Sequence, residues 1–436
     1  MTLSRSAARQ REKENRKRKN RRYMSLTLVA AGIVLVFTGV ALTAANGGKL
    51  SSLFGLDQDS APKTVTDGSK SNDGNNGGSY GFTLDDNHED SGNAASNQGT
   101  DEAVSSDNGD NEENAAANQG GDAAGISLSF VGDVLPGEYL NALMEQNGFG
   151  YPYEKAFFYL SEPDITAGNL ELPITLGGTP IEGTQYVYKG SPDALPALKK
   201  AGFDVLSLAT NHAMDQGVEG MRDTIAYLDE AGLGHMGTGN NDTEAFKPYV
   251  MEAKGIKVAF IGVSKVIPYK ELKADSNVPG IAETYETTRA VKAIQAAEEE
   301  ADITVVMVHW GEDNKDMPVD YQKQYARAYI DAGADLVIGS HPHVLQGFER
   351  YNGKWIAYSL GNFIFSSYPK GANAETGVLD ARCSKDGECE LAFNPMIVVQ
   401  GQPNPLEGEA SEAMLARLSS LSFGAKLDEN GKITAE

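Results

Sequence analysis

The sequence of 436 residues has only two cysteines and no overall excess of basic charge. Two thiols exclude a zinc module built on four cysteine ligands and a small domain held together by many disulfides. The formal net charge of −24 and the pI near 4.7 argue against binding of nucleic acid through the overall field, so no nucleic-acid partner is expected. A glycine-rich nucleotide-binding motif and a serine nucleophile elbow are also missing.

Charge is distributed unevenly along the chain. Residues 1–23 contain ten Lys or Arg and two Glu, a balance of +8, whereas residues 46–125 contain fifteen acidic residues and three Lys, a balance of −12. Residues 126–436 therefore carry the remaining −20. Such an asymmetry along one chain is typical of membrane topology.

Residues 24–45 form a run of 22 residues without charge, directly after the basic segment. As a helix the run would span about 33 Å, enough to cross ~30 Å of hydrocarbon. The basic flank predicts a cytoplasmic tail at 1–23, a single-pass signal-anchor helix at 24–45 and an extracytoplasmic remainder, hence a location in the cell membrane. A cleaved signal peptide is the alternative, because small residues, Thr43-Ala44-Ala45, end the apolar run.

Residues 46–125 are rich in small polar residues and poor in apolar ones. They include fourteen Gly and eleven Asn, but only three aromatic residues and no Ile. Such a segment cannot bury enough apolar surface to offset the entropy cost of ordering, so we expect a disordered acidic linker. The linker would tether residues 126–436 to the membrane helix.

Residues 126–436 alternate short apolar runs with helical patterns, which predicts a layered α/β domain. Strands are predicted at Ile126–Val131, Asp204–Ala209, Lys257–Val263, Ile303–His309, Ala334–Gly339 and Trp355–Leu360. Helices are predicted at Gly217–Ala231, Thr287–Ala301, Val319–Ala332 and Leu406–Leu421, the last being the final element of the domain. Two of the strands are apolar nearly throughout, as expected of strands covered on both faces.

The two cysteines, Cys383 and Cys389, flank an Asp-Gly turn signal. They can therefore face each other across a small ribbon. In an oxidising exterior a disulfide is expected, and a redox-active pair is the less favoured alternative because the spacing is not CxxC.

Polar residues of metal-ligating types follow several of the predicted strands. They are Asp133, Glu171, Asn211 with His212, His309, and His341-Pro342-His343. Taken singly, each has a structural explanation as a turn residue, a helix cap or a hydrogen-bonded core histidine. Because loops converge at the carboxyl ends of strands in layered α/β proteins, the coincidence predicts a site there. Such N and O donors suit Mn, Zn or Fe, so we expect one or two divalent transition-metal ions and hydrolase chemistry.

Six motifs together resemble a known family. They are, in chain order, Gly132-Asp133, Asn169-Leu170-Glu171, Asn211-His212-Ala213-Met214-Asp215, His309-Trp310-Gly311, Gly339-Ser340-His341-Pro342-His343 and Ser359-Leu360-Gly361-Asn362-Phe363. This combination, over roughly 126–421, resembles the poly-gamma-glutamate capsule biosynthesis protein family, CapA. That family is similar to the calcineurin-like metallophosphatases. The resemblance therefore implies a metallophosphatase-like fold, a two-sheet β-sandwich flanked by helices, for residues 126–436.

The resemblance also implies roles for individual residues. The implied metal ligands are Asp133, Glu171, Asn211, His309, His341 and His343. His212 would protonate the leaving group, and Asp215 would orient the His212 ring. The sequence departs from the phosphatase pattern in two places. Asp133-Val134-Leu135 stands where Asp-x-His is expected, so one metal position lacks a ligand. Glu171 replaces the bridging aspartate.

Three hypotheses for function follow. The first is a membrane-anchored, extracytoplasmic, phosphoesterase-like hydrolase that uses metal in the biosynthesis of poly-gamma-glutamate capsule or another cell-envelope polymer. The second is a non-catalytic subunit that binds or anchors this polymer in a capsule synthesis complex, which the missing first-motif histidine favours. The third is a surface domain that interacts with lipid or wall and has a structural metal. Retention of His212 and Asp215 favours the first hypothesis.

Overall fold

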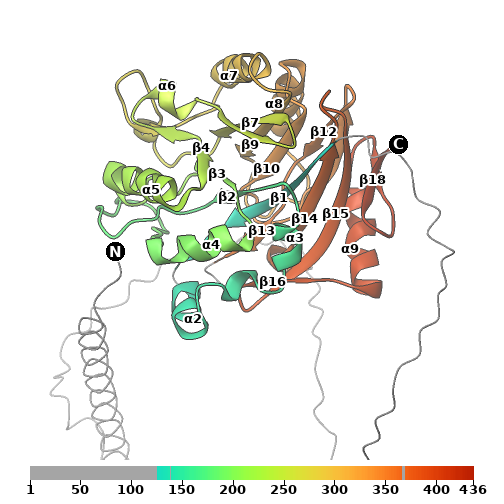
Figure 1. Cartoon of the computed structure of the whole chain (residues 1–436), viewed down its shortest axis with the longest axis horizontal. Helices are drawn as coiled ribbons and strands as arrows, with labels where there is room; N and C mark the ends of the chain where they lie inside the picture. The colour runs from blue at the N-terminus through green and yellow to red at the C-terminus, as the bar shows by residue number, and fades with distance from the viewer. Residues whose placement is uncertain (1–124, 138, 366–368) are drawn as a thin grey trace, which may run out of the picture. The chain divides into compact units, whose positions relative to one another are not determined.

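The computed structural model describes residues 125–436, except 138 and 366–368. The expected tail, membrane helix and linker (1–23, 24–45 and 46–125) lie outside the described residues, apart from Gly125. Within the described part of the chain, no helix is long and apolar enough to cross a membrane. These residues form a mixed α/β arrangement with several sheets (Figure 1).

The strands and helices alternate through most of the chain. The strands are β1 (Ile126–Val134), β2 (Ile165–Leu170), β3 (Val205–Ser207), β4 (Gly234–Met236), β5 (Thr238–Gly239), β6 (Tyr249–Ala253), β7 (Ile256–Ser264), β8 (Gly280–Ile281), β9 (Ile303–His309), β10 (Leu336–Ser340), β11 (Phe348–Tyr351), β12 (Lys354–Ala357), β13 (Asn362–Ile364), β14 (Glu375–Cys383), β15 (Cys389–Val399), β16 (Gln402–Pro405), β17 (Ala425–Leu427) and β18 (Lys432–Ala435). The α-helices are α2 (Tyr139–Asn147), α3 (Phe157–Ser161), α4 (Leu195–Ala201), α5 (Gly217–Ala231), α6 (Asp242–Ala245), α7 (Thr288–Glu298), α8 (Asp320–Asp331) and α9 (Gly408–Ser420).

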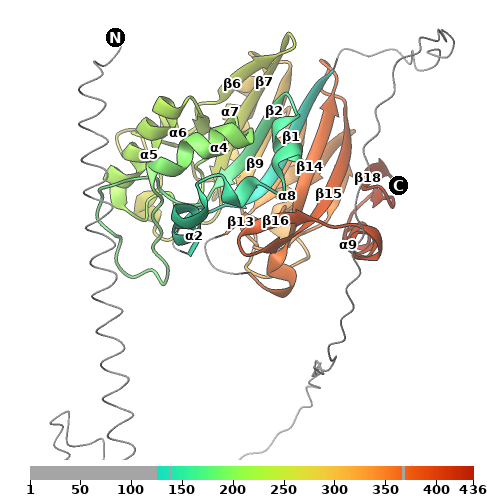
Figure 2. The same cartoon turned by 60° about the horizontal axis from the view of Figure 1, so that its bottom comes forward.

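Two large sheets contain most of these strands. The larger sheet has the order β17-β18-β15-β14-β1-β2-β3-β4, with β13 added on β1 and β16 on β15. The smaller sheet has the order β11-β12-β10-β9-β7-β6, and β5 and β8 form a separate pair. Strands β1 to β4 are parallel neighbours, as are β7, β9, β10 and β12. The long antiparallel strands β14 and β15 extend the larger sheet beyond β1 (Figure 2).

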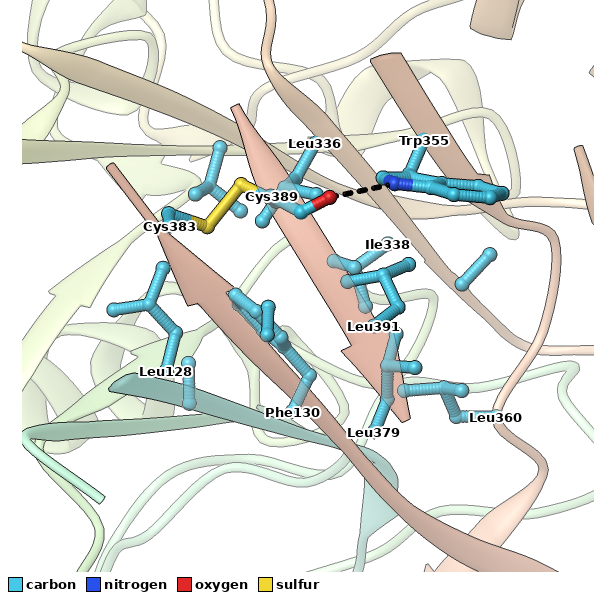
Figure 3. Packing of buried hydrophobic residues seen from close by; sticks show 14 of the residues in the cluster. Leu128, Phe130, Leu336, Ile338, Trp355, Leu360, Leu379, Cys383, Cys389 and Leu391 are labelled. Carbon is cyan, nitrogen blue, oxygen red and sulfur yellow. Dashed lines mark hydrogen bonds between the residues drawn. A yellow bond between two sulfur atoms is a disulfide. The ribbon is translucent and has the colours of Figure 1, made fainter. Parts of the chain in front are cut away.

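The core between the two large sheets forms because their strands alternate apolar side chains toward it. In β7, Val258 and Phe260 point into this core, whereas Ala259 and Ile261 belong to a second cluster on the outer face. Figure 3 shows Leu128 and Phe130 of β1 in the same cluster as Leu336 and Ile338 of β10. Strands buried on both faces confirm the expectation drawn from their nearly continuous apolar sequence.

Helices cover the outer faces of both large sheets. Apolar side chains of α2, α3, α4 and α5 pack in one cluster with the outer face of the larger sheet, and those of α7 and α8 with the smaller sheet (Figure 1). Each helix buries one apolar stripe; in α7 the stripe is Ala290, Ala293, Ile294 and Ala297. The order of layers is therefore helix, sheet, sheet, helix.

The predicted disulfide is confirmed. Cys383 ends β14 and pairs in register with Cys389 at the start of β15, and the two sulfur atoms are bonded. The carbonyl oxygen of Cys389 accepts a hydrogen bond of 2.9 Å from Nε1 of Trp355, which lies on β12 of the other sheet (Figure 3). The bridge thus closes a hairpin of two long strands, larger than the small ribbon expected.

The prediction that Leu406–Leu421 is the final element is wrong. The helix within this range, α9, is followed by β17 and β18, which pair with each other, and β18 also pairs with β15. These strands are short, and most of their side chains are at least half-exposed, so their hydropathy pattern is weak. Pairing of β18 with β15, which is distant in sequence, joins both strands to the larger sheet.

An aspartate immediately precedes four of the parallel strands. Each of these aspartates accepts a hydrogen bond from the backbone N–H at the start of the neighbouring strand and pairs with a lysine. The sets are Asp164 with Ser127 and Lys254, Asp204 with Thr166 and Lys199, Asp302 with Lys257 and Lys385, and Asp335 with Thr304 and Lys354. In return, the backbone N–H of each aspartate donates to the carbonyl oxygen of the residue whose backbone N–H its carboxylate accepts.

These aspartate pairs fix the register of the parallel strands. A slip of one residue would turn the neighbouring N–H away from the carboxylate and leave both groups without their partner. The device occurs in both large sheets, and always at the amino end of the strand. It therefore leaves the carboxyl ends of the same strands available for other chemistry.

Replacement of Asp204 tests this role. Asp204→Ala should lower the free energy of unfolding by about 1–3 kcal/mol, because the buried N–H of Thr166 loses its acceptor. Asp204→Asn is the matched control: it keeps an acceptor oxygen and loses only the pair with Lys199, whose partly exposed geometry contributes ~1 kcal/mol at most. Denaturant unfolding measures both. An equal loss in the two variants would contradict the backbone role.

Candidate metal centre

Eight side chains expected at the site come from the carboxyl ends of strands in both large sheets. They are Asp133 near the end of β1, Glu171 after β2, Asn211, His212 and Asp215 after β3, His309 at the end of β9, and His341 and His343 after β10. Because β1, β2 and β3 are parallel neighbours, as are β9 and β10, their ends lie at one edge of each sheet. The structure brings all eight to one location.

Two glycines allow the backbone to approach closely at this edge. A Cβ atom on Gly132 would lie 1.9 Å from the carbonyl oxygen of Gly361, the residue whose oxygen accepts the N–H of Asp133. A Cβ atom on Gly339 would lie 2.0 Å from the carbonyl oxygen of Tyr358. Only glycine fits at such contacts. The glycines of the sequence motifs thus position the side chains that follow them.

Asp133, Glu171 and His309 form a group that we call the inner cluster. All three side chains are fully buried. Nδ2 of Asn169 donates to Oδ1 of Asp133 at 2.8 Å and also to Oε2 of Glu171. His309 Nε2 lies 2.7 Å from Oδ1 of Asn211 and 3.3 Å from Oε1 of Glu171. One ligand atom of each cluster residue lies within 4.8 Å of the others.

Asp313, His341 and His343 form a second group, the outer cluster, with ligand atoms within the same mutual distance. His341 Nε2 lies 3.2 Å from Oδ1 of Asp313, and His343 Nδ1 lies 3.5 Å from Oδ2 of Asp133. Both histidines have positive φ, +96° for His341 and +59° for His343, a conformation that side-chain-bearing residues adopt at a cost. The ring centroids of His309 and His341 are 4.7 Å apart, so the two clusters are adjacent.

Burial and charge shift the titration of these groups. Burial raises the pKa of Glu171, but the charge of His309 outweighs burial and holds this pKa well below its usual range. Burial lowers the pKa of His343, but contact with Asp133 outweighs it and raises the pKa to about 9. Burial lowers the pKa of His341, and the nearby carboxylate offsets this only in part. Glu171 thus stays ionised, and the titration of His343 is shifted toward the positively charged form.

The donors present fit a divalent transition metal. Imidazole nitrogens and carboxylate oxygens are ligands of Mn, Zn and Fe. The inner cluster and the outer cluster each bring three such atoms close together. One buried oxygen atom in the same place, Oδ1 of Asn169, has no hydrogen-bond partner among the described residues, and Oε1 of Glu171 has only its contact of 3.3 Å with His309. Buried oxygens of this kind are costly unless a donor or a cation satisfies them.

His212 and Asp215 form a hydrogen-bonded pair beside the inner cluster. His212 Nδ1 lies 2.8 Å from Oδ2 of Asp215, which also accepts the backbone N–H of Tyr188 at 2.6 Å. Burial lowers the pKa of His212, but the hydrogen bond to Asp215 outweighs it and raises the pKa above its ordinary value. The ring of Tyr188 packs at 4.6 Å from that of His212. The imidazole is therefore fixed through Nδ1, and Nε2 remains for proton transfer.

A cavity of about 770 Å³ opens onto these groups. Its polar lining includes Glu171, Asn211, His212, Asp215, Asp313, His341 and His343. An aromatic wall of Tyr186, Tyr188 and Phe365 and the cation of Lys370 stand around them. Tyr186 and Tyr188 are stacked with nearly parallel rings, 6.1 Å apart, and Tyr186 is half-exposed. The cavity can hold a segment of a polymer as well as a small ester.

The sequence did not identify every residue that contributes to the site. Asn169 lies inside a quoted motif, but nothing in the pattern indicated that its amide binds two carboxylates. Ser340 Oγ lies 2.9 Å from Nδ1 of His309 and orients that ring. Asp313 was missed as well, and its only sequence signal is a second acidic residue four positions after His309.

Comparison with known proteins places this arrangement in context. The model of the family described as "Bacterial capsule synthesis protein PGA_cap" matches residues 127–367. "PGA biosynthesis protein CapA" of Bacillus subtilis is 33% identical over 315 residues, 71% of this chain and 82% of that protein. "Capsule biosynthesis protein CapA" of Bacillus anthracis is 31% identical over 292 residues, 64% of this chain and 69% of that protein.

Among solved structures, an NAD nucleotidase of Haemophilus influenzae aligns with a TM-score of 0.38 and 13% identity. The alignment covers 70% of this chain and 65% of that one.

Gly132→Ala tests whether close backbone approach positions Asp133. The added methyl would meet the Gly361 carbonyl, so the variant should lose about 1–3 kcal/mol of stability and part of its affinity for divalent metal. Denaturant unfolding and titration with Mn²⁺ or Zn²⁺ measure the two effects. Gly150→Ala is the control, because a Cβ there would meet nothing within 4 Å and should change neither quantity. Unchanged stability in Gly132→Ala would contradict the steric argument.

Proposed function

This chain belongs to the bacterial capsule synthesis protein family that includes the CapA proteins, and on that premise we propose that it is a metal-dependent hydrolase acting on a cell-envelope polymer. The favoured substrate is poly-gamma-glutamate, and a phosphoester of another envelope polymer is the second choice. The observation that supports the proposal most is the His212–Asp215 pair beside two clusters of metal-ligating side chains. A protein that only binds a polymer has no need of a fixed imidazole at that point.

The proposed ligands are the three residues of the inner cluster together with Asn211, His341 and His343. A divalent transition metal at this place would supply Lewis acidity, stabilising negative charge on a substrate oxygen and making water more acidic. Asn169 and Ser340 would hold the ligands in position, because their side chains contact the carboxylates and His309 directly.

The proposed proton donor is His212. The carboxylate of Asp215 accepts Nδ1–H and so leaves Nε2 to deliver a proton to the leaving group. Asp215 is itself held by the backbone N–H of Tyr188, and the Tyr188 ring limits rotation of the imidazole. Burial raises the pKa of Asp215 above its ordinary value, and its hydrogen bonds keep the carboxylate directed at the imidazole.

The proposed polymer is anionic, whereas residues 126–436 carry −20. Overall attraction is therefore unfavourable, and recognition has to be local. The local features are the aromatic wall, the Lys370 cation and the positive charge that a bound metal would bring to the cavity. Stacked rings such as Tyr186 and Tyr188 can pack against the methylene groups of a glutamyl chain while its carboxylates face cations.

A second candidate function is a non-catalytic subunit of a capsule synthesis complex that binds or anchors the polymer. Two observations favour it: Leu135 stands where the phosphatase pattern has a ligand, and the two CapA relatives are named for biosynthesis. The His212–Asp215 pair favours the hydrolase.

The site is tested by three histidine variants. His309→Ala should lower the content of bound Mn²⁺ or Zn²⁺, since it removes an imidazole from the inner cluster. His212→Ala should keep the metal but lower hydrolysis of phosphodiester and gamma-glutamyl substrates by ~10²–10⁴-fold. His235→Ala is the control, because His235 pairs with Asp229 outside the cavity.

Metal analysis and substrate turnover measure these outcomes. A wild-type protein that takes up metal and binds polyglutamate, yet turns over no substrate, would support the binding subunit instead. A wild-type protein that takes up no metal would overturn both versions.

We also propose that residues 24–45 anchor the protein in the cell membrane, with residues 126–436 outside. The support is the uncharged run of 22 residues and the +8 charge before it. On intact cells, protease should remove an epitope tag at the C-terminus and leave one at the N-terminus; detergent lysis, which should expose both tags, is the control. A soluble mature form starting near Asn46 would establish cleavage and contradict the anchor.

A further inference from the structure

The outer cluster contains a carboxylate that the sequence motifs do not include. Asp313 lies in the loop after β9, beyond Gly311, whose φ of +98° turns the chain toward the cavity. Its Oδ1 is 3.2 Å from His341 Nε2, and its side chain is 64% exposed in the cavity wall. Exposed ion pairs contribute little to stability, so the contact between Asp313 and His341 is not explained by stabilisation of the fold.

His343 is prepared to bind through one ring nitrogen. The amide of Asn362 donates through Nδ2 to the carbonyl oxygens of His343 and Asn373, at 3.3 and 3.0 Å. Its Oδ1 must therefore accept, and it does so from His343 Nδ1 at 2.9 Å. In the neutral ring with its proton on Nδ1, the lone pair is on Nε2. This is how a ligand histidine is usually oriented by its second nitrogen.

His341 offers a further unsatisfied atom. Its side chain is more than nine-tenths buried, and its Nδ1 has no hydrogen-bond partner among the described residues. Its Nε2 faces the carboxylate of Asp313. A buried imidazole that lacks a partner on one nitrogen and points the other at an exposed carboxylate is costly in a purely structural role.

Asp133 connects the two clusters. Its Oδ1 accepts from Asn169 and lies 4.0 Å from His309 Nδ1, whereas its Oδ2 lies 3.5 Å from His343 Nδ1. Each oxygen of one buried carboxylate thus lies near a side chain of a different cluster, so the two clusters are adjacent.

We propose that Asp313 is a metal ligand which, with His341 and His343, forms a second divalent-metal position next to the inner cluster. The proposal rests on the proposed function and extends it from one ion to two. Asp313 then supplies a donor where the first motif, with Leu135, has none. The ion at this position faces the cavity, because Asp313, His341 and His343 all line it.

The second ion also changes the charge of the site. Asp133, Glu171 and Asp313 are three carboxylates, so they outnumber one divalent ion by one charge, whereas two divalent ions outnumber them by one. By this count of ions and carboxylates, the two-ion site has a balance of +1 and the one-ion site a balance of −1, within a domain of −20. An anionic substrate is attracted to the cavity when Asp313 holds its ion, because short-range charge outweighs the screened overall field.

Metal content of the full-length protein tests the proposal. Wild type loaded with Mn²⁺ and dialysed should retain about two ions per chain, and Asp313→Asn about one. Glu312→Gln is the matched control: it removes the same charge from the adjacent residue, which belongs to neither cluster, and should retain both ions. Electron paramagnetic resonance gives a second readout, since a spin-coupled Mn²⁺ pair in wild type should become an isolated Mn²⁺ signal in Asp313→Asn.

The outcomes separate the two proposals. Equal metal content in Asp313→Asn and wild type, while His309→Ala still loses metal, overturns the role of Asp313 and leaves the inner site in place. A wild type without metal overturns the proposed function itself. The melting temperature of metal-free Asp313→Asn should equal that of metal-free wild type, because the replaced side chain is largely exposed; a large drop would show a structural role and contradict the proposal.

Discussion

The complete burial of two carboxyl groups, Asp133 and Glu171, is the constraint on which the site depends. A charge on such a buried group costs several kcal/mol when it leaves water, so the surroundings must compensate it. The compensation comes from both large sheets: the amide of Asn169 on β2 binds both carboxylates, and His309 on β9 lies beside them. The face-to-face packing of the sheets therefore brings together charges that neither sheet could stabilise alone.

The central strands and the location of the site were predictable because both depend on local patterns. Continuous apolar runs gave β9 its exact observed limits, and glycine-containing motifs marked the strand ends at which Asp133 and His341 lie. The rule that ligands gather at the carboxyl ends of strands then placed seven of the eight residues at one edge, and Asp215 was added by the family resemblance. The disulfide followed from a turn signal between Cys383 and Cys389.

What could not be predicted depends on contacts between distant segments. The strands β17 and β18 are mostly exposed; β18 is defined by pairing with β15, and β17 by pairing with β18. Asp313 is an ordinary exposed acid in the sequence, and only the turn at Gly311 brings it to His341. The aspartates before the parallel strands look like loop residues in the sequence. The backbone N–H groups that bind to Asp164, Asp204 and Asp302 lie 37, 38 and 45 residues away, respectively.

Aspartate side chains hold the strands in register at the amino ends of the parallel strands and form part of the candidate site at the carboxyl ends. Because structural support and chemistry lie at different edges, one can change without the other. Aspartates at the amino ends, such as Asp204 and Asp335, fix which residues face each other across the strands. The loops at the carboxyl ends are relieved of that task. Their length and composition can diverge, or be exchanged in the laboratory, without altering the frame beneath them. The fold thus behaves as a stable base with an exchangeable reactive surface, on which a new substrate preference requires new loops and not a new core.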